Sequence, residues 1–237
     1  MGLSRPSRPK TTSIGGFFIT GTDTDVGKTR IAANLAHTLV QLGFELCVRK
    51  PVASGCLQQA DGQLLAQDAL LLKQAANSSE TLQKICPWQY APAISPHLAI
   101  AQAGHRVLIR QLAEACQPEK TQQLLLVEGA GGWLSPLASD GFNQDLAQRL
   151  GLPVILVIAD RLGAINQALL SAQAIRAAGL ELYAAVVNQP MIAASGFTEG
   201  LESWLPCPLY YQPYSAQPEP QFLTELAEQL SHRLSCG

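Results

Sequence analysis

The segment of residues 21–29 has the residue types and the spacing of a phosphate-binding loop. It follows the apolar run 16–20 and opens a helical pattern, which is the strand, loop and helix order that a P-loop requires. Backbone N–H groups and the helix N-terminus would face the phosphates, Lys28 would reach the β- and γ-phosphates, and the Thr29 hydroxyl would ligate Mg²⁺. Thr22 stands where the common first glycine of such a loop would be. The alternative is a glycine turn that ends in an exposed lysine.

Glu128 is the first candidate partner for a metal beside this loop. It follows the apolar run 124–127 and precedes the glycine-rich stretch 129–132, so we expect it at the carboxyl end of a strand. Ligands of parallel sheets gather outside those ends, and glycines let the backbone approach a ligand closely. A surface glutamate in a glycine-rich turn is the alternative.

Asp68 is a second candidate carboxylate, with two interpretations. It lies four residues from both Leu64 and Leu72, so in a continuous helix it would join an apolar stripe and would need a partner such as Mg²⁺. Equally, Asp68 would be the N-cap of a helix that begins only at Ala69. The spacing does not decide between them.

Lys50 ends a strand predicted at residues 46–52, which we expect to lie beside the first strand. That placement would bring a second cation near the phosphate loop. The irregular turn formed by Pro51 and Gly55 favours a functional edge over a solvated lysine.

The elements that must position these groups alternate between apolar strands and amphipathic helices. Further strands are predicted at 123–127, 153–158 and 184–187, and their unbroken apolar runs are typical of strands covered on both faces. The pattern predicts an α/β fold with a doubly wound, mainly parallel sheet flanked by helices, of the P-loop NTPase type.

The helical predictions rest on apolar spacing. The first helix carries an apolar stripe that Gly43 ends, a second helix spans 163–178 with four inward residues, a closing helix lies near 219–234, and residues 206–220 form a surface loop. The two stripes consist of Ile31, Leu35, Leu39 and Leu42, and of Ile165, Leu169, Ala172 and Ile175.

Composition narrows the class of protein. The 237 residues, 47% hydrophobic and 14% charged, predict a single domain over 15–237 after a loose basic tail at 1–14. The net charge of −2 argues against nucleic acid as the main partner, and the apolar runs are too short to cross a membrane. The six cysteines are scattered, without zinc-site spacing, so we expect free thiols and a cytoplasmic protein.

Six segments and Asn188 together resemble the dethiobiotin synthetase family, in order along a match that runs from about residue 16 to residue 214. The segments are 21–29 (GTDTDVGKT), 50–55 (KPVASG), 68–70 (DAL), 95–97 (SPH), 127–133 (VEGAGGW) and 162–166 (LGAIN). The resemblance implies a homodimeric, ATP-dependent cyclo-ligase of biotin synthesis. Such an enzyme joins CO₂ to the diamine 7,8-diaminononanoate, through a carbamate and a carbamic-phosphoric anhydride, with ATP as co-substrate and Mg²⁺ as cofactor.

The resemblance also implies roles for individual residues. The implied catalytic residues are Lys28, Lys50 and Thr24, and the implied metal ligands are Thr29, Asp68 and Glu128. The implied ATP-binding residues are Asp25, Val26, Gly27, Lys28, Thr29, Arg30, Asp68, Glu128, Gly129, Ala130, Gly131, Asn188, Gln189, Pro213 and Tyr214. Ser54 would bind the substrate, and Gly163, Ala164, Ile165 and Asn166 would hold its carboxylate tail at a subunit interface.

The sequence departs from the family pattern at two places, and two other functions remain as alternatives. Asp25 replaces a more familiar glutamate, and residues 210–214 (YYQPY) replace the family's usual segment near adenine. A corrinoid amidoligase-like protein would usually carry a glutaminase domain, for which we expect no room after Pro220. A ParA/MinD-like ATPase switch would carry a second lysine where this chain has Asp23.

Overall fold

The computed structural model of the chain describes residues 15–189, 196–215 and 223–235. Within these ranges six strands form one parallel sheet in the order β12-β11-β10-β1-β7-β2. The predicted tail at 1–14 and Cys236 lie outside the described ranges. The strands of the sheet are β1 (Gly16–Gly21), β2 (Leu46–Arg49), β7 (Leu124–Gly132), β10 (Val154–Ala159), β11 (Leu182–Asn188) and β12 (Leu209–Gln212).

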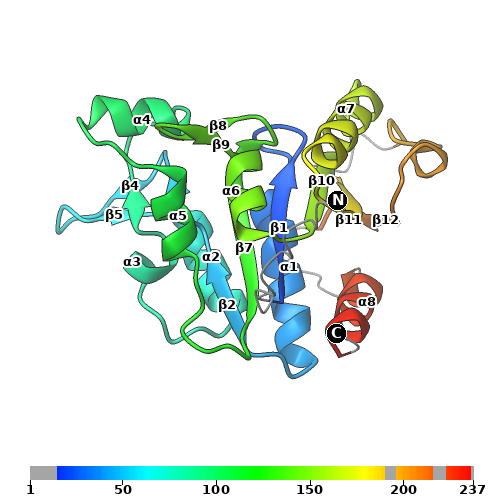
Figure 1. Cartoon of the computed structure of the whole chain (residues 1–237), viewed down its shortest axis with the longest axis horizontal. Helices are drawn as coiled ribbons and strands as arrows, with labels where there is room; N and C mark the ends of the chain where they lie inside the picture. The colour runs from blue at the N-terminus through cyan, green and yellow to red at the C-terminus, as the bar shows by residue number, and fades with distance from the viewer. Residues whose placement is uncertain (1–14, 190–195, 216–222, 236–237) are drawn as a thin grey trace, which may run out of the picture.

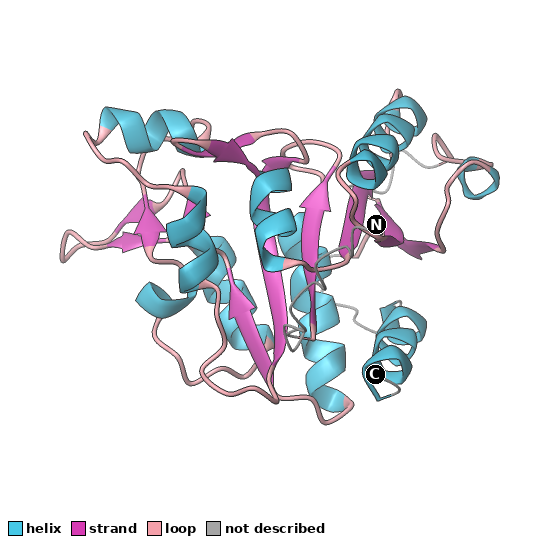
Figure 2. Cartoon of the chain, in the orientation of Figure 1, coloured by secondary structure: helices cyan, strands magenta, loops and turns pink. Residues whose placement is uncertain are grey.

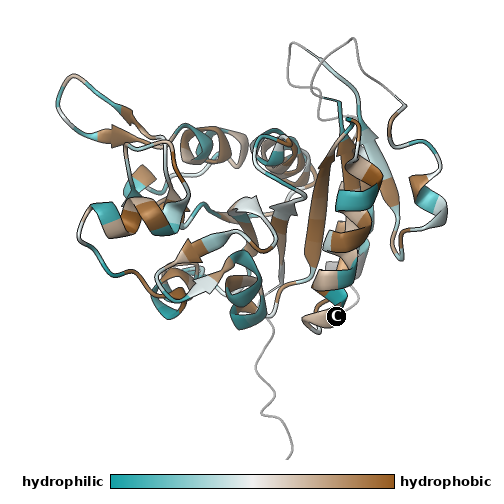
Figure 3. Cartoon of the chain, turned by 90° about the horizontal axis from the view of Figure 1, so that it is seen from above, coloured by the Kyte–Doolittle hydropathy of each residue, from teal (hydrophilic) through white to brown (hydrophobic). Residues whose placement is uncertain are grey.

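Helices cover both faces of this sheet, as Figures 1 and 2 show. One hydrophobic core packs residues of α4, α5, α6 and α7 against the sheet, and a second core packs residues of α1, α2, α3 and α8 against the opposite face. Figure 3 shows the hydrophobic residues along the central strands, whereas the helices carry both hydrophobic and hydrophilic residues. The helices are α1 (Lys28–Gln41), α2 (Gln67–Ala75), α3 (Leu82–Ile85), α4 (Pro96–Gln102), α5 (Ile109–Ala115), α6 (Asn143–Leu150), α7 (Ala164–Ala177) and α8 (Thr224–Ser235).

Three short pairs of strands and one helical turn complete the architecture. The pairs are β3 (Val52–Ala53) with β6 (Trp88–Gln89), β4 (Leu57–Gln58) with β5 (Leu64–Leu65), and β8 (Pro136–Ala138) with β9 (Gly141–Phe142). The turn is η1 (Leu201–Ser203). None of the helices described here is both long and apolar enough to span a membrane.

The first helix begins and ends near the predicted positions. Ile31, Leu35 and Leu39 are buried in one core, as the stripe predicts. Leu42 caps the helix and is 42% exposed, so its predicted place in the stripe is wrong. Gly43 follows with a φ of 92°, a left-handed conformation that ends the helix.

The second strand differs from the prediction in length and in place. It ends at Arg49, and Val52 pairs instead with Trp88 in a separate short ladder. Pro51 has no N–H to donate to a ladder, which accounts for the break. The predicted neighbour is also wrong, because β7 lies between β1 and β2.

Two further boundaries differ from the prediction, because strands here continue through glycine and next to proline. β7 continues beyond Val127 to Gly132, with Gly132 paired to Gly21 after a register shift, so Glu128 lies within the strand. The predicted surface loop at 206–220 contains β12, which pairs with β11 and buries Tyr210 and Gln212.

The two C-terminal helical predictions are partly corrected. In α7 the residues Ala172 and Ile175 are buried, whereas Ile165 and Leu169 are half-buried and pack at the margin of the core. The closing helix begins at Thr224, and the predicted start at 219 falls outside the described ranges.

Candidate functional site: a P-loop with two buried lysines

The phosphate loop joins β1 to α1 and has the backbone shape that an anion site needs. Gly27 caps α1 with a φ of 92°, and a Cβ there would lie 2.1 Å from the Asn188 side-chain nitrogen. That nitrogen donates a hydrogen bond to the Val26 carbonyl at 3.0 Å. Only glycine therefore fits at residue 27, and Asn188 at the end of β11 holds the loop. The N-terminus of α1, with Lys28 and Thr29, lines a cavity where its N–H groups can bind an anion.

Lys28 folds back over the loop rather than into solvent. Its Nζ donates to the Asp23 carbonyl at 2.8 Å, and the residue is 7% exposed, so the alternative of an exposed lysine is wrong. Burial, followed by the positive charge of Lys50, lowers the pKa of Lys28 to about 8, although Glu128 and Asp68 oppose the shift. A phosphate beside Lys28 would favour its charged form.

Lys50 lies at the centre of the site. Because Arg49 on β2 pairs with Val127 on β7, the next residues, Lys50 and Glu128, lie side by side. The Nζ of Lys50 is 2.7 Å from Glu128 Oε1 and 2.9 Å from Asp68 Oδ2, and it donates to the Gly129 carbonyl at 3.1 Å. Burial alone would lower the pKa of Lys50, but the charges of Glu128 and Asp68 raise it above its ordinary value.

Asp68 fits neither interpretation drawn from spacing. Helix α2 begins at Gln67 with Ala66 as its cap, so a cap before a helix starting at Ala69 is wrong. Leu64 belongs to β5, so no continuous stripe joins it to Asp68. Burial would raise the pKa of Asp68, but the charge of Lys50 brings it below its usual range. The carboxylate is therefore held in its charged form at the edge of the site.

The donor set suits a hard divalent cation. Glu128 is 1% exposed, so the alternative of a surface glutamate is wrong. Its Oε1 accepts from the Thr29 hydroxyl at 2.8 Å, and its Oε2 is buried without a hydrogen-bond partner. Mg²⁺ prefers such oxygens and completes its shell with waters and substrate phosphates. The described part of the chain has no group of three or more His, Cys, Asp or Glu side chains that could hold a metal by themselves. A Mg²⁺ ion bound by one or two carboxylates, waters and phosphates does not need such a group.

A cavity of about 700 Å³ opens beside these groups. It joins most of the residues predicted from the phosphate loop and the strand ends, and it extends past them toward α4. The predicted residues that line it are Thr24, Asp25, Gly27, Lys28, Thr29, Lys50, Ser54, Asp68, Glu128, Ala130 and Gly131. Val26 and Gly129 do not line it. Val26 is a buried residue of the loop itself, and a Cβ on Gly129 would lie 2.3 Å from the Asn143 side-chain oxygen.

The residues predicted around the nucleobase gather beside the cavity, at the ends of β11 and β12. Arg30 donates to the Pro213 carbonyl at 2.9 Å and to the Asn188 side chain at 3.5 Å. Gln189 donates its backbone N–H to the Gln212 carbonyl at 3.0 Å. Tyr214, on the same segment, is 38% exposed. The structure therefore places these residues together, next to the phosphate loop.

The residues predicted to hold the substrate tail lie outside this cavity. Gly163 caps α7 with a φ of 87°, Ala164 is buried, and Asn166 is exposed. None of residues 163–166 lines the cavity of their own chain. Arg161, two residues before Gly163, pairs with Asp23 of the phosphate loop at 2.8 Å, so the start of α7 lies beside the loop but outside the cavity.

Sequence reasoning assigned no role to several residues that line the cavity: Ala53, Ala93, Ile94, Ser95, Pro96 and Ser135. Ser95 is hydrogen-bonded to His97 Nδ1 at 2.8 Å, and the Ser135 hydroxyl accepts from the Gly132 N–H at 2.8 Å. Ser95 precedes Pro96, the first residue of α4, and a proline at that position is a helix-start signal in the sequence. Ser135 follows the glycine stretch without any signal of its own.

Comparisons with known proteins agree with this geometry. A family model described as an AAA domain matches residues 15–202. The ATP-dependent dethiobiotin synthetase of Pseudomonas aeruginosa (strain UCBPP-PA14) is 46% identical over 187 residues, covering 78% of this chain and 82% of the relative. The chain belongs to the dethiobiotin synthetase family. Another member, from Pseudoalteromonas translucida (strain TAC 125), is 38% identical over 219 residues, covering 90% of this chain and 96% of the relative.

A solved structure extends the likeness to fold alone. The MinC:MinD cell division protein complex of Aquifex aeolicus matches with a TM-score of 0.56 at 15% identity, covering 94% of this chain and 96% of that chain. The match confirms the predicted class, a central parallel sheet flanked by helices as in P-loop NTPases. Its low identity carries no function to this member of the dethiobiotin synthetase family.

Proposed function

We propose that this chain uses ATP to convert 7,8-diaminononanoate and CO₂ into dethiobiotin, in biotin biosynthesis. The observation that carries the proposal is the pairing of two lysines at one phosphate loop. Lys28 and Lys50 line the same cavity, one from the first turn of α1 and the other from the residue that follows β2. The family relatives, named as ATP-dependent dethiobiotin synthetases, support the same activity.

The chemistry has three steps, and negative charge on the carbamate and on the transferring phosphoryl group must be stabilised during the first two. An amine nitrogen of the diamine bonds to the carbon of CO₂ and loses a proton, which gives a carbamate. A carbamate oxygen then attacks the γ-phosphorus, and the bond to ADP breaks. The second amine attacks the carbamate carbon, loses its proton and displaces phosphate, which closes the cyclic urea.

The two lysines stabilise the charge that moves through these steps. Lys28 lies over the loop that binds the β- and γ-phosphates, so its ammonium would neutralise the transferring phosphoryl group. Lys50 lies between Glu128 and Asp68 and would face both the phosphoryl group and the carbamate. Thr24 and Ser54, which line the same cavity, would hold the carbamate or the diamine.

Mg²⁺ would be held by Thr29, Glu128 and Asp68, together with phosphate oxygens, and when bound it supplies charge neutralisation at the β- and γ-phosphates. The unpartnered Oε2 of Glu128 supports this assignment. The loop residues from Asp25 to Arg30, with residues 129–131, would surround the phosphates. Asn188, Gln189, Pro213 and Tyr214 would surround the base.

The active form is proposed to be a homodimer. The N-terminus of α7 carries no cap from a side chain, so its backbone N–H groups at residues 163–166 can bind a carboxylate. The preceding Leu162 is 86% exposed, which supports burial of this corner by a second subunit. In that arrangement the diamine tail of one subunit would bind to α7 of its partner.

The five described cysteines are free, which supports a cytoplasmic location.

Isotope transfer tests this function. Purified protein would be incubated with ATP, Mg²⁺, the diamine and ¹³C-bicarbonate, and the products read by mass spectrometry. We expect a cyclic urea that carries one ¹³C. Absence of the labelled ring, in protein that still binds ATP, would contradict the proposal. Hydrolysis that DNA or lipid stimulates, and that the diamine leaves unchanged, would favour a switch of the MinD type instead.

A further inference from the structure

Arg49 is a buried charge that the proposed chemistry does not use. It is the last residue of β2, at the edge of the described sheet, and its side chain is 0% exposed. Its guanidinium donates from Nε to the Ala115 carbonyl at 3.2 Å and from Nη1 to the Val48 carbonyl at 2.8 Å. A buried guanidinium also needs a counter-charge, because an unpaired charge in the interior is costly.

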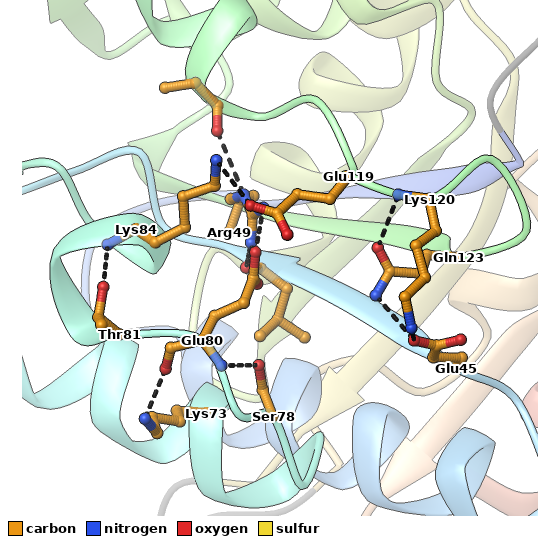
Figure 4. Close-up of polar contacts among 12 residues, drawn as sticks. Glu45, Arg49, Lys73, Ser78, Glu80, Thr81, Lys84, Glu119, Lys120 and Gln123 are labelled. Carbon is orange, nitrogen blue, oxygen red and sulfur yellow. Dashed lines mark hydrogen bonds and ion pairs between the residues drawn. The ribbon is translucent and has the colours of Figure 1, made fainter.

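Glu80 supplies that counter-charge, as Figure 4 shows. Its two carboxylate oxygens accept from Nη1 and Nη2 of Arg49 at 2.5 and 2.8 Å, which is a bidentate pair. Glu80 lies between α2 and α3 and is itself only 17% exposed at its side chain. The pair therefore ties the segment that follows α2 to the end of β2.

Both ends of helix α2 are thus linked to the adjacent residues Arg49 and Lys50. Near its N-terminus, Asp68 contacts Lys50 at 2.9 Å. In its last turn, Lys73 donates to the Glu80 carbonyl at 2.5 Å, and Glu80 holds Arg49. Because Arg49 and Lys50 are adjacent, a movement of the Glu80 end of α2 would also shift Asp68 relative to Lys50.

The contacts of Arg49 also join the two layers of helices around the edge of the sheet. Ala115 ends α5, which packs in one core, whereas α2 and α3 pack in the other. A cation at the C-terminus of α5 is favourable for the helix dipole. Arg49 therefore links β2, α5 and the α2–α3 segment at one point, a short distance along the chain from the reacting groups.

We propose that Arg49 and Glu80 are positioning residues, which fix α2 so that Asp68 stays against Lys50 at the metal-binding edge of the site. The inference rests on the proposed function, because it assigns Asp68 to the Mg²⁺–nucleotide complex. Neither residue lines the cavity. Their effect passes through α2 and through the peptide that joins Arg49 to Lys50.

The test measures the metal-dependent part of nucleotide binding rather than turnover. The dissociation constant of ADP would be measured by calorimetry in excess Mg²⁺ and again in EDTA, for the wild type and for Glu80→Gln. Glutamine keeps the shape of Glu80 but leaves Arg49 without a counter-charge. We expect the strengthening of ADP binding by Mg²⁺ to fall about tenfold, as for other outer-shell partners of metal ligands, with the EDTA value unchanged.

Two further variants make the result interpretable. Lys73→Met cuts the link between α2 and the Glu80 backbone without removing a buried charge, so it tests the same idea if Glu80→Gln folds poorly. Glu119→Gln is the control, because it removes an exposed ion pair, Lys84 with Glu119 at 3.4 Å, from the same cluster (Figure 4). We expect a reduced Mg²⁺ effect in Lys73→Met and none in Glu119→Gln.

The outcomes separate this inference from the proposed function. A folded Glu80→Gln and a folded Lys73→Met that both keep the wild-type Mg²⁺ effect would overturn the positioning role. An equal loss of affinity with and without Mg²⁺ would overturn it too, because that is the behaviour of a general loss of structure. If Mg²⁺ fails to strengthen ADP binding even in the wild type, the metal site of the proposed function fails as well.

Discussion

Two helices of this protein begin with the same local geometry in very different surroundings. Both α1 and α7 are capped by a glycine in the left-handed conformation, with φ of 92° at Gly27 and 87° at Gly163, and neither has a side-chain cap. The N-terminus of α1 faces two buried lysines and a buried glutamate. The N-terminus of α7 follows an exposed leucine, outside the cavity.

The difference shows that helix geometry provides an anion site but does not select the anion. Uncapped N–H groups at a helix start favour any nearby negative group. At α1 the added cations and the oxygen donors suit a metal-bound polyphosphate. At α7 no buried lysine adds to the backbone N–H groups, and the nearby Arg161 is already paired with Asp23 at 2.8 Å. Such a site suits a single carboxylate, as the proposed tail of the diamine would be.

The largest effect on turnover is expected from substitutions of Lys28 and Lys50, because these two cations are present at α1 and absent at α7. Lys28→Ala and Lys50→Gln should each lower kcat by about 10²–10³-fold, through loss of charge stabilisation during phosphoryl transfer. Steady-state kinetics would measure this, with circular dichroism to verify folding. Near-wild-type kcat in either variant would remove that lysine from the chemistry.

Metal dependence should be the next largest effect. Glu128→Gln and Asp68→Asn should raise the Mg²⁺ concentration for half-maximal turnover by about 10–100-fold, because each removes a charged oxygen donor. A Mg²⁺ titration of turnover at saturating ATP would measure the change. An Asp68→Asn enzyme with unaltered Mg²⁺ dependence would show that Asp68 only pairs with Lys50.

A pH effect should follow from the buried state of Lys28. Its pKa in the ligand-free protein is about 8, and bound phosphates favour the charged form, so nucleotide binding above pH 8 requires uptake of a proton. ADP affinity should be level below about pH 8 and should fall about tenfold per pH unit above it. Calorimetry would measure the profile. Lys28→Arg should flatten it, and an unchanged profile in that variant would contradict the assignment.

The smallest effect is expected at α7. Leu162→Asp should weaken the proposed subunit contact and raise the KM for the diamine about tenfold, with little change in the KM for ATP. Sedimentation would report the oligomeric state of the same samples. A fully active monomer would contradict the shared site and would leave the ATP chemistry standing.

Patterns local in sequence predicted the α1 side of this comparison well. The order of strand, loop and helix determines the positions of Lys28 and Thr29 at the helix start, because a P-loop is a continuous segment. The placement of Lys50 and of Glu128 near the loop was also predicted, each separately and for Lys50 from the wrong strand order, because all parallel strands end at the same edge. Their direct contact at 2.7 Å was not predicted. The burial of Glu128 inside β7 could not be predicted, because the glycine-rich residues 129–132 that follow it are typical of a turn and not of a strand.

Contacts between segments far apart in the sequence could not be predicted from local patterns. Nothing local marks Glu80 as the partner of Arg49, because the loop that brings them together follows from the packing of α2. The strand β12 was hidden between prolines, since a four-residue run gains its stability from pairing with β11. Asp68 had two local interpretations. The start of α2 at Gln67 and the place of Leu64 in β5 decided against both.

The most direct test of the account is ADP release measured with and without the diamine. With ATP, Mg²⁺ and bicarbonate present, the account predicts that ADP release depends on the diamine and that one ADP forms for each cyclic urea. Diamines with shorter carboxylate tails should bind more weakly but still release ADP. ADP release that is indifferent to the diamine, with no cyclic urea formed, would contradict the central claim.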